Sequence, residues 1–189
     1  PRSVYAISKV FAYHSVIHYR EAYNVYACNG ILFNHESPRR GVNFVTKKIT
    51  QGLTRIKNGK QKTLFLGNLY SRRDWGHAKD YVESMWKILQ QKKPDDYVVA
   101  TRTSHSVKDF INICAKKLDI KLIWKKKGLN EVGINKSNNK IIIKIDKKYF
   151  RETEVDNLIG NYSKAKKILK WKPKFTFDKL VDDMLKNED

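Results

Sequence analysis

The sequence predicts an α/β protein with a parallel sheet, and two observations carry that prediction. Segments with helical periodicity alternate with short apolar segments, and the helical segments are long enough to cross from one parallel strand to the next. Residues 26–33 form a continuous apolar run with β-branched and aromatic side chains. Such a run is typical of a strand that is covered on both faces. The chain has 189 residues, a length that suits one domain with an appended lobe.

The first hundred residues give three helices and three strands. Ser3 can cap a helix that runs to about residue 23, because Tyr5, Ala12 and Val16 follow helical spacing. The strand over residues 26–33 comes next and is expected to be central and buried on both faces. A turn at residues 37–41 precedes the remaining elements, which are helices over residues 44–57 and 80–91 and strands over residues 63–66 and 97–100.

The rest of the chain continues the alternation. Ser106 and Ser163 can each cap a helix, and these helices reach about residues 118 and 169. The other elements are an extended segment at residues 121–124, a lysine-rich loop at 125–140, a strand at 141–145 and a helix at 177–186.

The composition is strongly basic, with 39 Lys and Arg against 19 Asp and Glu and a formal net charge of +20. This balance keeps a basic nucleic-acid-binding module open as an alternative. However, 30 of the 39 basic residues are Lys, and they are scattered over the chain. The sequence shows neither an aromatic and basic stacking pattern nor a recognition helix. Binding to nucleic acid is therefore not expected.

The cysteines and the apolar residues bear on location. Cys28 and Cys114 stand far apart, without a second thiol at metal-ligand or redox spacing, so both are expected to be reduced. No run approaches the ~20 apolar residues that a membrane-spanning helix needs. The sequence starts without an apolar secretory signal. We therefore expect a cytoplasmic protein with no membrane anchor and no metal site.

The first candidate chemistry is a tyrosine and a lysine four residues apart. Tyr5 and Lys9 fall on one face of the first expected helix. A nearby ammonium favours the phenolate, so it can turn a tyrosine into an acid/base group at neutral pH. This spacing alone is common on surface helices.

Longer motifs give the spacing a context. Residues 26–41 read YACNGILFNHESPRRG, and residues 73–82 read RDWGHAKDYV. Together with residues 1–9, 19–23, 149–156 and 169–173, they closely resemble the GDP-mannose 4,6-dehydratase family, which belongs to the extended short-chain dehydrogenase/reductase superfamily. The phosphate-binding glycine fingerprint of a dinucleotide fold occurs nowhere in the sequence. The match therefore corresponds to the C-terminal portion of such an enzyme.

The resemblance implies a lyase that uses NADP to convert GDP-mannose to GDP-4-dehydro-6-deoxymannose. In this family the tyrosine, here Tyr5, takes the proton of the sugar 4-hydroxyl while hydride leaves C4. The lysine, here Lys9, lowers the pKa of the phenol and holds the nicotinamide ribose. The resemblance also places His35 and Arg40 near the cofactor.

The diphosphate of a nucleotide sugar requires cations, and guanidinium groups suit it because they bind in a bidentate manner. Arg73 and Arg151 lie inside matched motifs and are the expected diphosphate ligands. Asn34 and Lys48 are expected as further substrate contacts. Glu154 can accept hydrogen bonds from ribose hydroxyls, although a local ion pair between Arg151 and Glu154 remains an alternative.

The expected fold is the C-terminal half of a Rossmann-like parallel sheet plus a small α/β substrate-binding lobe. Residues 1–101 are expected to form the partial NADP-binding domain, and residues 102–189 mainly the lobe. Since the glycine-rich half is absent from the sequence, we expect the isolated chain to be inactive. The complete enzyme is expected to be a homo-oligomer that pairs through the helix at residues 3–23. Another nucleotide-sugar dehydratase or epimerase of the superfamily is the second alternative.

Overall fold

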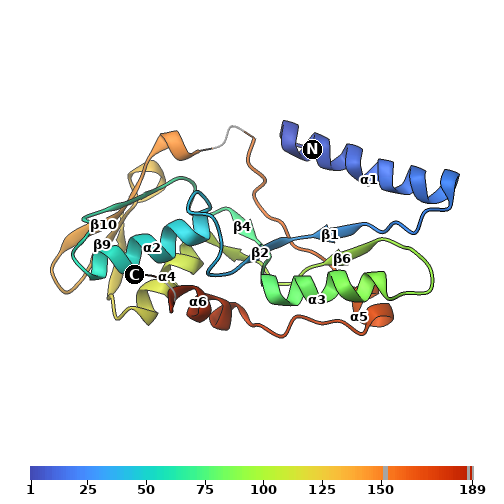
Figure 1. Cartoon of the computed structure of the whole chain (residues 1–189). Coiled ribbons are helices and arrows are strands. Elements are labelled where there is room, and N and C mark those ends of the chain that lie inside the picture. The colour runs from blue at the N-terminus through green and yellow to red at the C-terminus, as the bar shows by residue number, and fades with distance from the viewer. Residues whose placement is uncertain (151–152, 187, 189) are drawn as a thin grey trace.

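The computed structural model describes residues 1–150, 153–186 and 188, and it has an α/β architecture (Figure 1). The helices are α1 (Val4–Tyr23), α2 (Val45–Lys57), α3 (Ala78–Leu89), α4 (Val107–Lys117), α5 (Ser163–Leu169) and α6 (Phe177–Leu185), with 3-10 turns η1 (Gly128–Asn130) and η2 (Lys147–Tyr149). The strands are β1 (Gly30–Leu32), β2 (Asn34–Glu36), β3 (Leu64–Leu66), β4 (Arg72–Arg73), β5 (Trp75–His77), β6 (Tyr97–Val99), β7 (His105–Ser106), β8 (Leu122–Lys125), β9 (Val132–Asn135) and β10 (Lys140–Ile145).

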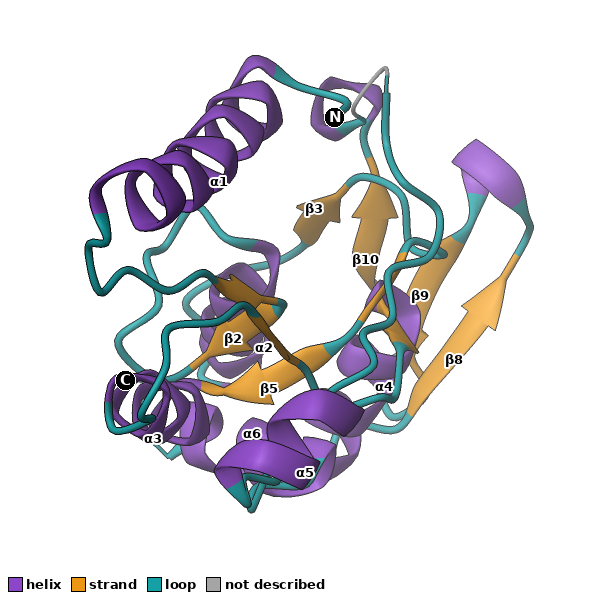
Figure 2. Ribbon diagram, turned by 90° about the vertical axis from the view of Figure 1, so that its right-hand side faces the viewer, coloured by secondary structure: helices purple, strands orange, loops and turns teal. Residues whose placement is uncertain are grey.

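The strands form two parallel pairs, the antiparallel pair of β4 with β7, and one mixed sheet. β1 pairs with β6 and β2 pairs with β5, both in parallel, as expected when helices connect successive strands. The largest sheet has the order β3-β10-β9-β8, in which β10 runs parallel to β3 and antiparallel to β9. Figure 2 shows this sheet beside α4, with β2 and β5 on the other side of α4. The predicted α/β class with parallel strand pairs is confirmed.

Two apolar cores hold these layers. The first lies where α2, α4 and α6 meet around the large sheet, and Ile49, Phe110, Ile143 and Leu180 are buried in it. The second joins α3 and β6 to α5 and is centred on Trp171. Each core takes residues from before and after position 101, where we expect a domain boundary. That boundary stays a prediction.

Two of the three predicted serine caps, Ser3 and Ser106, are confirmed. The Ser3 hydroxyl accepts a hydrogen bond from the Ala6 amide at 3.1 Å, so it caps α1 as predicted. Ser106 begins α4 with a capping box, because its hydroxyl binds the Asp109 amide and the Asp109 carboxylate binds the Ser106 amide. Both caps depend on residues three positions apart, which is why the sequence predicts them well.

The prediction of a buried central strand over residues 26–33 is wrong in its length and in its burial. Only Gly30–Leu32 forms the strand β1, and Ile31 is 40% exposed. A strand is covered only by the elements around it. Among the described residues, β6 is the only strand paired with β1, and α3 packs against it on one side. The other edge of β1 has no described strand beside it.

Three further expectations differ from the structure. The stretch 125–140 is not a loop, because it contains η1 and β9. Ser163 is the first residue of α5 rather than its cap, and its hydroxyl donates to the Asn161 side chain at 2.6 Å. The sequence also predicts no strand at β2, β4, β5 or β7. These strands are two or three residues long and are too short to produce a periodic pattern. No described helix is both long and apolar enough to cross a membrane.

Candidate active site

Tyr5 and Lys9 share one face of α1, as their spacing predicts. The Lys9 ammonium lies 5.3 Å from the centre of the Tyr5 ring. Tyr5 is 71% exposed, and α1 has no buried residue anywhere along its length. Figure 1 shows α1 apart from the other helices, on the opposite side of β1 from α3. Tyr5 and Lys9 are therefore close together, and the face of α1 that carries them is exposed.

His35 and Arg40 lie on β2 and on the turn after it. The His35 ring stacks on the ring of Tyr81 at 4.8 Å between centres, and its Nδ1 lies 2.9 Å from the Phe33 carbonyl oxygen. The Nε atom of Arg40 lies 2.9 Å from the Glu36 carboxylate. Glu36, four residues away in sequence, thus holds Arg40, whereas His35 packs against Tyr81 of α3.

Glu36 is a site residue that sequence reasoning missed. Its carboxylate is buried, and it accepts a hydrogen bond from the Thr46 hydroxyl at 2.6 Å. Burial raises the pKa of Glu36, although the Thr46 and Arg40 contacts oppose the shift. The available signal was an acidic residue four positions before Arg40, the spacing at which they pair. Glu36 therefore fixes Arg40 and the start of α2 together.

The two expected substrate ligands that the structure brings into contact are Arg73 and Glu154. Their side chains form an ion pair at 3.2 Å between Nη2 and Oε1. Arg73 also donates from Nη1 to the carbonyl oxygens of Val155 at 2.6 Å and of Arg72 at 2.8 Å. Arg151 lies outside the described residues, so the alternative pairing of Arg151 with Glu154 is not described.

Asn34 and Lys48 approach the same region from two other elements. Asn34 is opposite Trp75 in the register of β2 and β5, and Trp75 is two residues after Arg73. The Lys48 ammonium lies 3.4 Å from the centre of the Tyr149 ring. Residues 153–158 then run back along β4, where the Arg72 amide donates to the Asp156 carbonyl oxygen. Of the expected substrate side chains in the described residues, Arg73 and Glu154 are therefore in contact, Lys48 lies over Tyr149 of η2, and Asn34 lies on the strand beside β5.

One hydrogen bond links the start of α1 to the segment that carries Glu154. The Thr153 hydroxyl donates to the Arg2 carbonyl oxygen at 2.7 Å, just before α1 begins. Within the described part of the chain, no hydrogen bond or ion pair joins Tyr5 or Lys9 to His35 or Arg40. Two surface cavities, of about 330 and 350 Å³, are lined by other residues, around Tyr162 and around Phe175.

Asp74 is a second residue that sequence reasoning missed. Its carboxylate is fully buried and accepts hydrogen bonds from the backbone amides of Thr101, Arg102 and Gly160. It thereby joins the loop after β6 to the segment that leads into α5. An aspartate between Arg73 and Trp75 gives no local signal of this role, because all three donors are distant in sequence.

Solved structures with the same architecture define the class. A structure described as RMD from Pseudomonas aeruginosa with NADPH superimposes with a TM-score of 0.79 at 18% identity, covering 99% of this chain and 56% of that one. A dTDP-glucose 4,6-dehydratase from Bacillus anthracis in complex with NAD gives a TM-score of 0.76 at 19% identity, covering 99% and 52%. The chain has the fold of one half of a Rossmann-type nucleotide-sugar dehydratase or epimerase of the short-chain dehydrogenase/reductase superfamily.

Sequence comparison narrows the class to one family. A family model described as GDP-mannose 4,6 dehydratase matches residues 1–184. GDP-mannose 4,6 dehydratase 1 of Arabidopsis thaliana is 57% identical over 185 residues, covering 98% of this chain and 46% of that protein. The Drosophila melanogaster and human GDP-mannose 4,6 dehydratases are 54% and 50% identical, each over 98% of this chain. The chain belongs to the GDP-mannose 4,6 dehydratase family.

The extent of the match is as informative as its identity. The chain spans about half the length of the curated relatives it matches. Neither alternative, another enzyme of the superfamily or a nucleic-acid-binding module, is favoured by these comparisons.

Proposed function

We propose that this chain supplies the acid/base pair and the nucleotide-sugar site of a GDP-mannose 4,6-dehydratase, a lyase, and that it acts together with a glycine-rich N-terminal half. Family membership over residues 1–184 is the observation that carries the proposal. The contact between Arg73 and Glu154, two of the expected substrate ligands, supports it. The substrate class is a guanosine diphosphate sugar, GDP-mannose.

The residues divide the work by their chemistry. Tyr5 takes the proton from the sugar 4-hydroxyl, and the Lys9 ammonium stabilises the phenolate that holds the negative charge. Arg73 and Arg151 neutralise the diphosphate, with Lys48 adding charge and Asn34 a hydrogen bond. Glu154 accepts hydrogen bonds from the ribose hydroxyls.

The residues present fit the nicotinamide end of NADP. Tyr5 and Lys9 stand exposed on one face of α1, and Arg40 and His35 follow β1, so polar groups are available without a glycine-rich loop. Bound there, NADP would supply the hydride transfer between C4 and C6 of the sugar. The adenosine and pyrophosphate have no expected ligands in this sequence, so we expect the isolated chain to bind NADP weakly or not at all.

The exposed apolar residues of α1 support assembly. Ile7 and Phe11 are exposed on this helix, whereas Tyr13 and Ile17 are half-buried. A helix that is apolar on more than one side needs partners on more than one side. The complete enzyme is therefore a homo-oligomer that pairs through α1, in the cytoplasm. Sedimentation of the complete enzyme as a monomer would contradict this pairing.

Restoring the missing half tests the function directly. The N-terminal half of the Arabidopsis thaliana relative would be joined before Pro1, and conversion of GDP-mannose would be followed by chromatography of the sugar nucleotide. The proposal expects dehydration by the joined protein and none by the 189-residue chain alone. Tight NADP binding and full turnover by the isolated chain would contradict it.

A further inference from the structure

The helix that carries Tyr5 and Lys9 is held to the rest of the chain by polar contacts rather than by burial. No residue of α1 is buried. Its Arg20 forms a bidentate ion pair with Asp96, with Nη1 2.8 Å from Oδ1 and Nη2 3.2 Å from Oδ2. Both side chains are largely withdrawn from solvent. Bidentate pairs of this kind constrain direction as well as distance.

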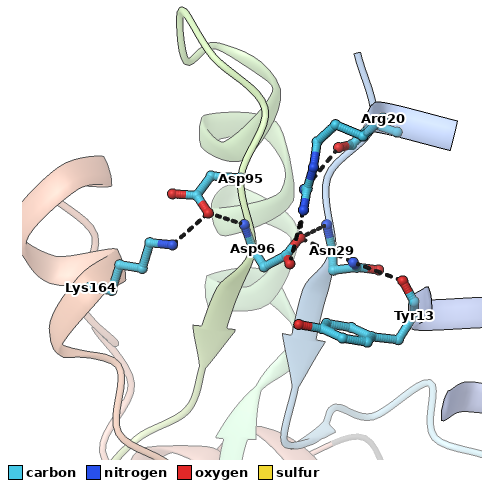
Figure 3. Close-up of polar contacts among 7 residues, drawn as sticks. Tyr13, Arg20, Asn29, Asp95, Asp96 and Lys164 are labelled. Carbon is cyan, nitrogen blue, oxygen red and sulfur yellow. Dashed lines mark hydrogen bonds and ion pairs between the residues drawn. The ribbon is translucent and has the colours of Figure 1, made fainter. Parts of the chain in front are cut away.

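Asp96 also reaches α1 at a second point, through Asn29 (Figure 3). The Asn29 backbone amide and side-chain amide both donate to Oδ1 of Asp96, at 3.1 and 3.0 Å. The same side-chain amide lies 3.3 Å from the carbonyl oxygen of Tyr13. Tyr13 and Arg20 are two helical turns apart, about 10 Å along the axis. Two contacts at that separation determine how the helix points.

Away from α1, Asn29 and Asp96 are fixed to the paired strands β1 and β6. Asn29 directly precedes β1 and Asp96 directly precedes β6, and the Tyr97 amide donates to the Asn29 carbonyl oxygen at 2.9 Å. The network therefore joins α1 to the paired starts of two parallel strands. Asp95, the neighbouring carboxylate, pairs with Lys164 of α5 and accepts a hydrogen bond from the Asp96 backbone amide at 2.7 Å.

We propose that Asp96 is a positioning residue: through Arg20 and Asn29 it sets the direction of α1 and thereby the place of Tyr5 and Lys9. This rests on the proposed function only for its catalytic consequence. Tyr5 is about 22 Å along the helix from Arg20, so a tilt of 10° at the anchor moves the phenol by about 4 Å. Displacements near 1 Å at a reacting group already cost about 100-fold in rate.

The charge state of Asp96 supports the same role. Burial acts to raise the pKa of Asp96, but the hydrogen bonds from Arg20 and Asn29 outweigh burial and lower it. The carboxylate therefore stays ionised across the neutral range and keeps both contacts.

A distance measurement in the 189-residue chain tests the proposal without substrate or cofactor. Nitroxide labels at Ile7→Cys on α1 and Val82→Cys on α3, in a Cys28→Ser background, report the distance by double electron–electron resonance. Asp96→Asn is expected to broaden the distance distribution by about 4 Å or more. Asp178→Asn is the matched control, since it removes an exposed carboxylate of α6 whose partner, Lys117, is on α4, and it is expected to leave the distribution unchanged.

The outcomes separate cleanly. An unchanged distribution in Asp96→Asn, or equal broadening in Asp178→Asn, would overturn the proposal. If Asp96→Asn does not fold, Arg20→Gln, which removes the guanidinium on the helix side of the ion pair, decides by the same measurement.

Kinetics of the restored enzyme test the catalytic consequence. In that enzyme, Asp96→Asn is expected to lower kcat about 10-fold to 100-fold while the KM for GDP-mannose stays within about twofold. Arg20→Gln is expected to lower kcat in the same way, and Arg20→Lys, which keeps the charge, is expected to lower it less. Equal losses in kcat and in substrate binding would contradict a positioning role. Failure of any restored enzyme to dehydrate GDP-mannose would overturn the proposed function and leave the distance result standing.

Discussion

The guanidinium of Arg73 and the carboxylate of Glu154 form an ion pair at 3.2 Å across 81 positions of sequence. Both side chains are expected to bind the nucleotide sugar. In the free chain, Glu154 thus stands where a diphosphate oxygen could stand against Arg73. The ion pair with Glu154 keeps the Arg73 guanidinium oriented before substrate binds. Binding would then replace one anionic partner of Arg73 with another.

Replacing Arg73 with Lys tests this role, because Lys keeps the charge but lacks the planar pair of donors. We expect the dissociation constant for GDP to rise about tenfold or more, the equivalent of one charge-assisted hydrogen bond. Isothermal titration calorimetry of the 189-residue chain with GDP would measure it. Arg39→Lys, at an exposed arginine of the turn before α2, is the matched control. Equal affinity in both variants would remove Arg73 from the substrate site.

Tyr5→Phe in the restored enzyme removes the proposed acid/base group and nothing else of the side chain. We expect turnover of GDP-mannose to fall about 100-fold to 10,000-fold with nearly unchanged sugar-nucleotide binding. Tyr19→Phe removes the hydroxyl of another exposed tyrosine on α1 and should have little effect. Full turnover by Tyr5→Phe would show that the assigned role is wrong.

The two cysteines should differ sharply in reactivity. Cys114 is fully buried, and burial raises the pKa of its thiol well above the usual range. Cys28 is only half-buried. We expect a disulfide reagent at pH 8 to modify one thiol in the folded chain and two in urea. Cys28→Ser should abolish the native-state reaction, and residual reaction in that variant would contradict the burial of Cys114.

Trp171 should carry much of the stability of the second core. It is 1% exposed, and its indole N–H donates to the Asp80 carbonyl oxygen at 2.8 Å. Trp171→Ala is expected to lower the free energy of unfolding by about 3–5 kcal/mol, the usual cost of deleting a large buried side chain. Trp86, which is 63% exposed, supplies the control Trp86→Ala. Urea unfolding followed by circular dichroism would measure both, and similar losses would refute the packing described.

Glu36 should make stability depend on pH in a definite direction. Its pKa in the folded chain lies above the ordinary value of 4.5 because the carboxyl is buried. The contribution of Glu36 is therefore fully present below about pH 4.5 and is lost as pH rises through the folded pKa. Glu36→Gln cannot ionise. The wild type should thus lose free energy of unfolding relative to Glu36→Gln between pH 4 and pH 8, and a difference that grew in the opposite sense would contradict the shift.

The sequence alone determined the features that depend on neighbours within a few positions. Ser3 and Ser106 cap helices because their acceptor and donor groups are three residues apart, and Tyr5 and Lys9 share a face because four residues make about one turn. The long motifs likewise identified the family without any coordinates, since each motif is a run of consecutive residues. Most helices, and the strands β3, β6 and β10, followed from local sequence patterns in the same way.

Only the tertiary structure decided which distant groups meet. Nothing in the sequence pairs Arg73 with Glu154, Asp96 with Arg20, or Asp74 with the Gly160 amide, because each contact closes a loop of more than seventy residues. The exposure of β1 was also a tertiary matter. Its apolar residues are compatible with a buried strand, but burial depends on which other elements are present to cover it. Helix caps and helical periodicity depend on residues close in sequence, so the sequence predicts them. Packing and ion pairing between distant residues depend on the path that the chain takes through space.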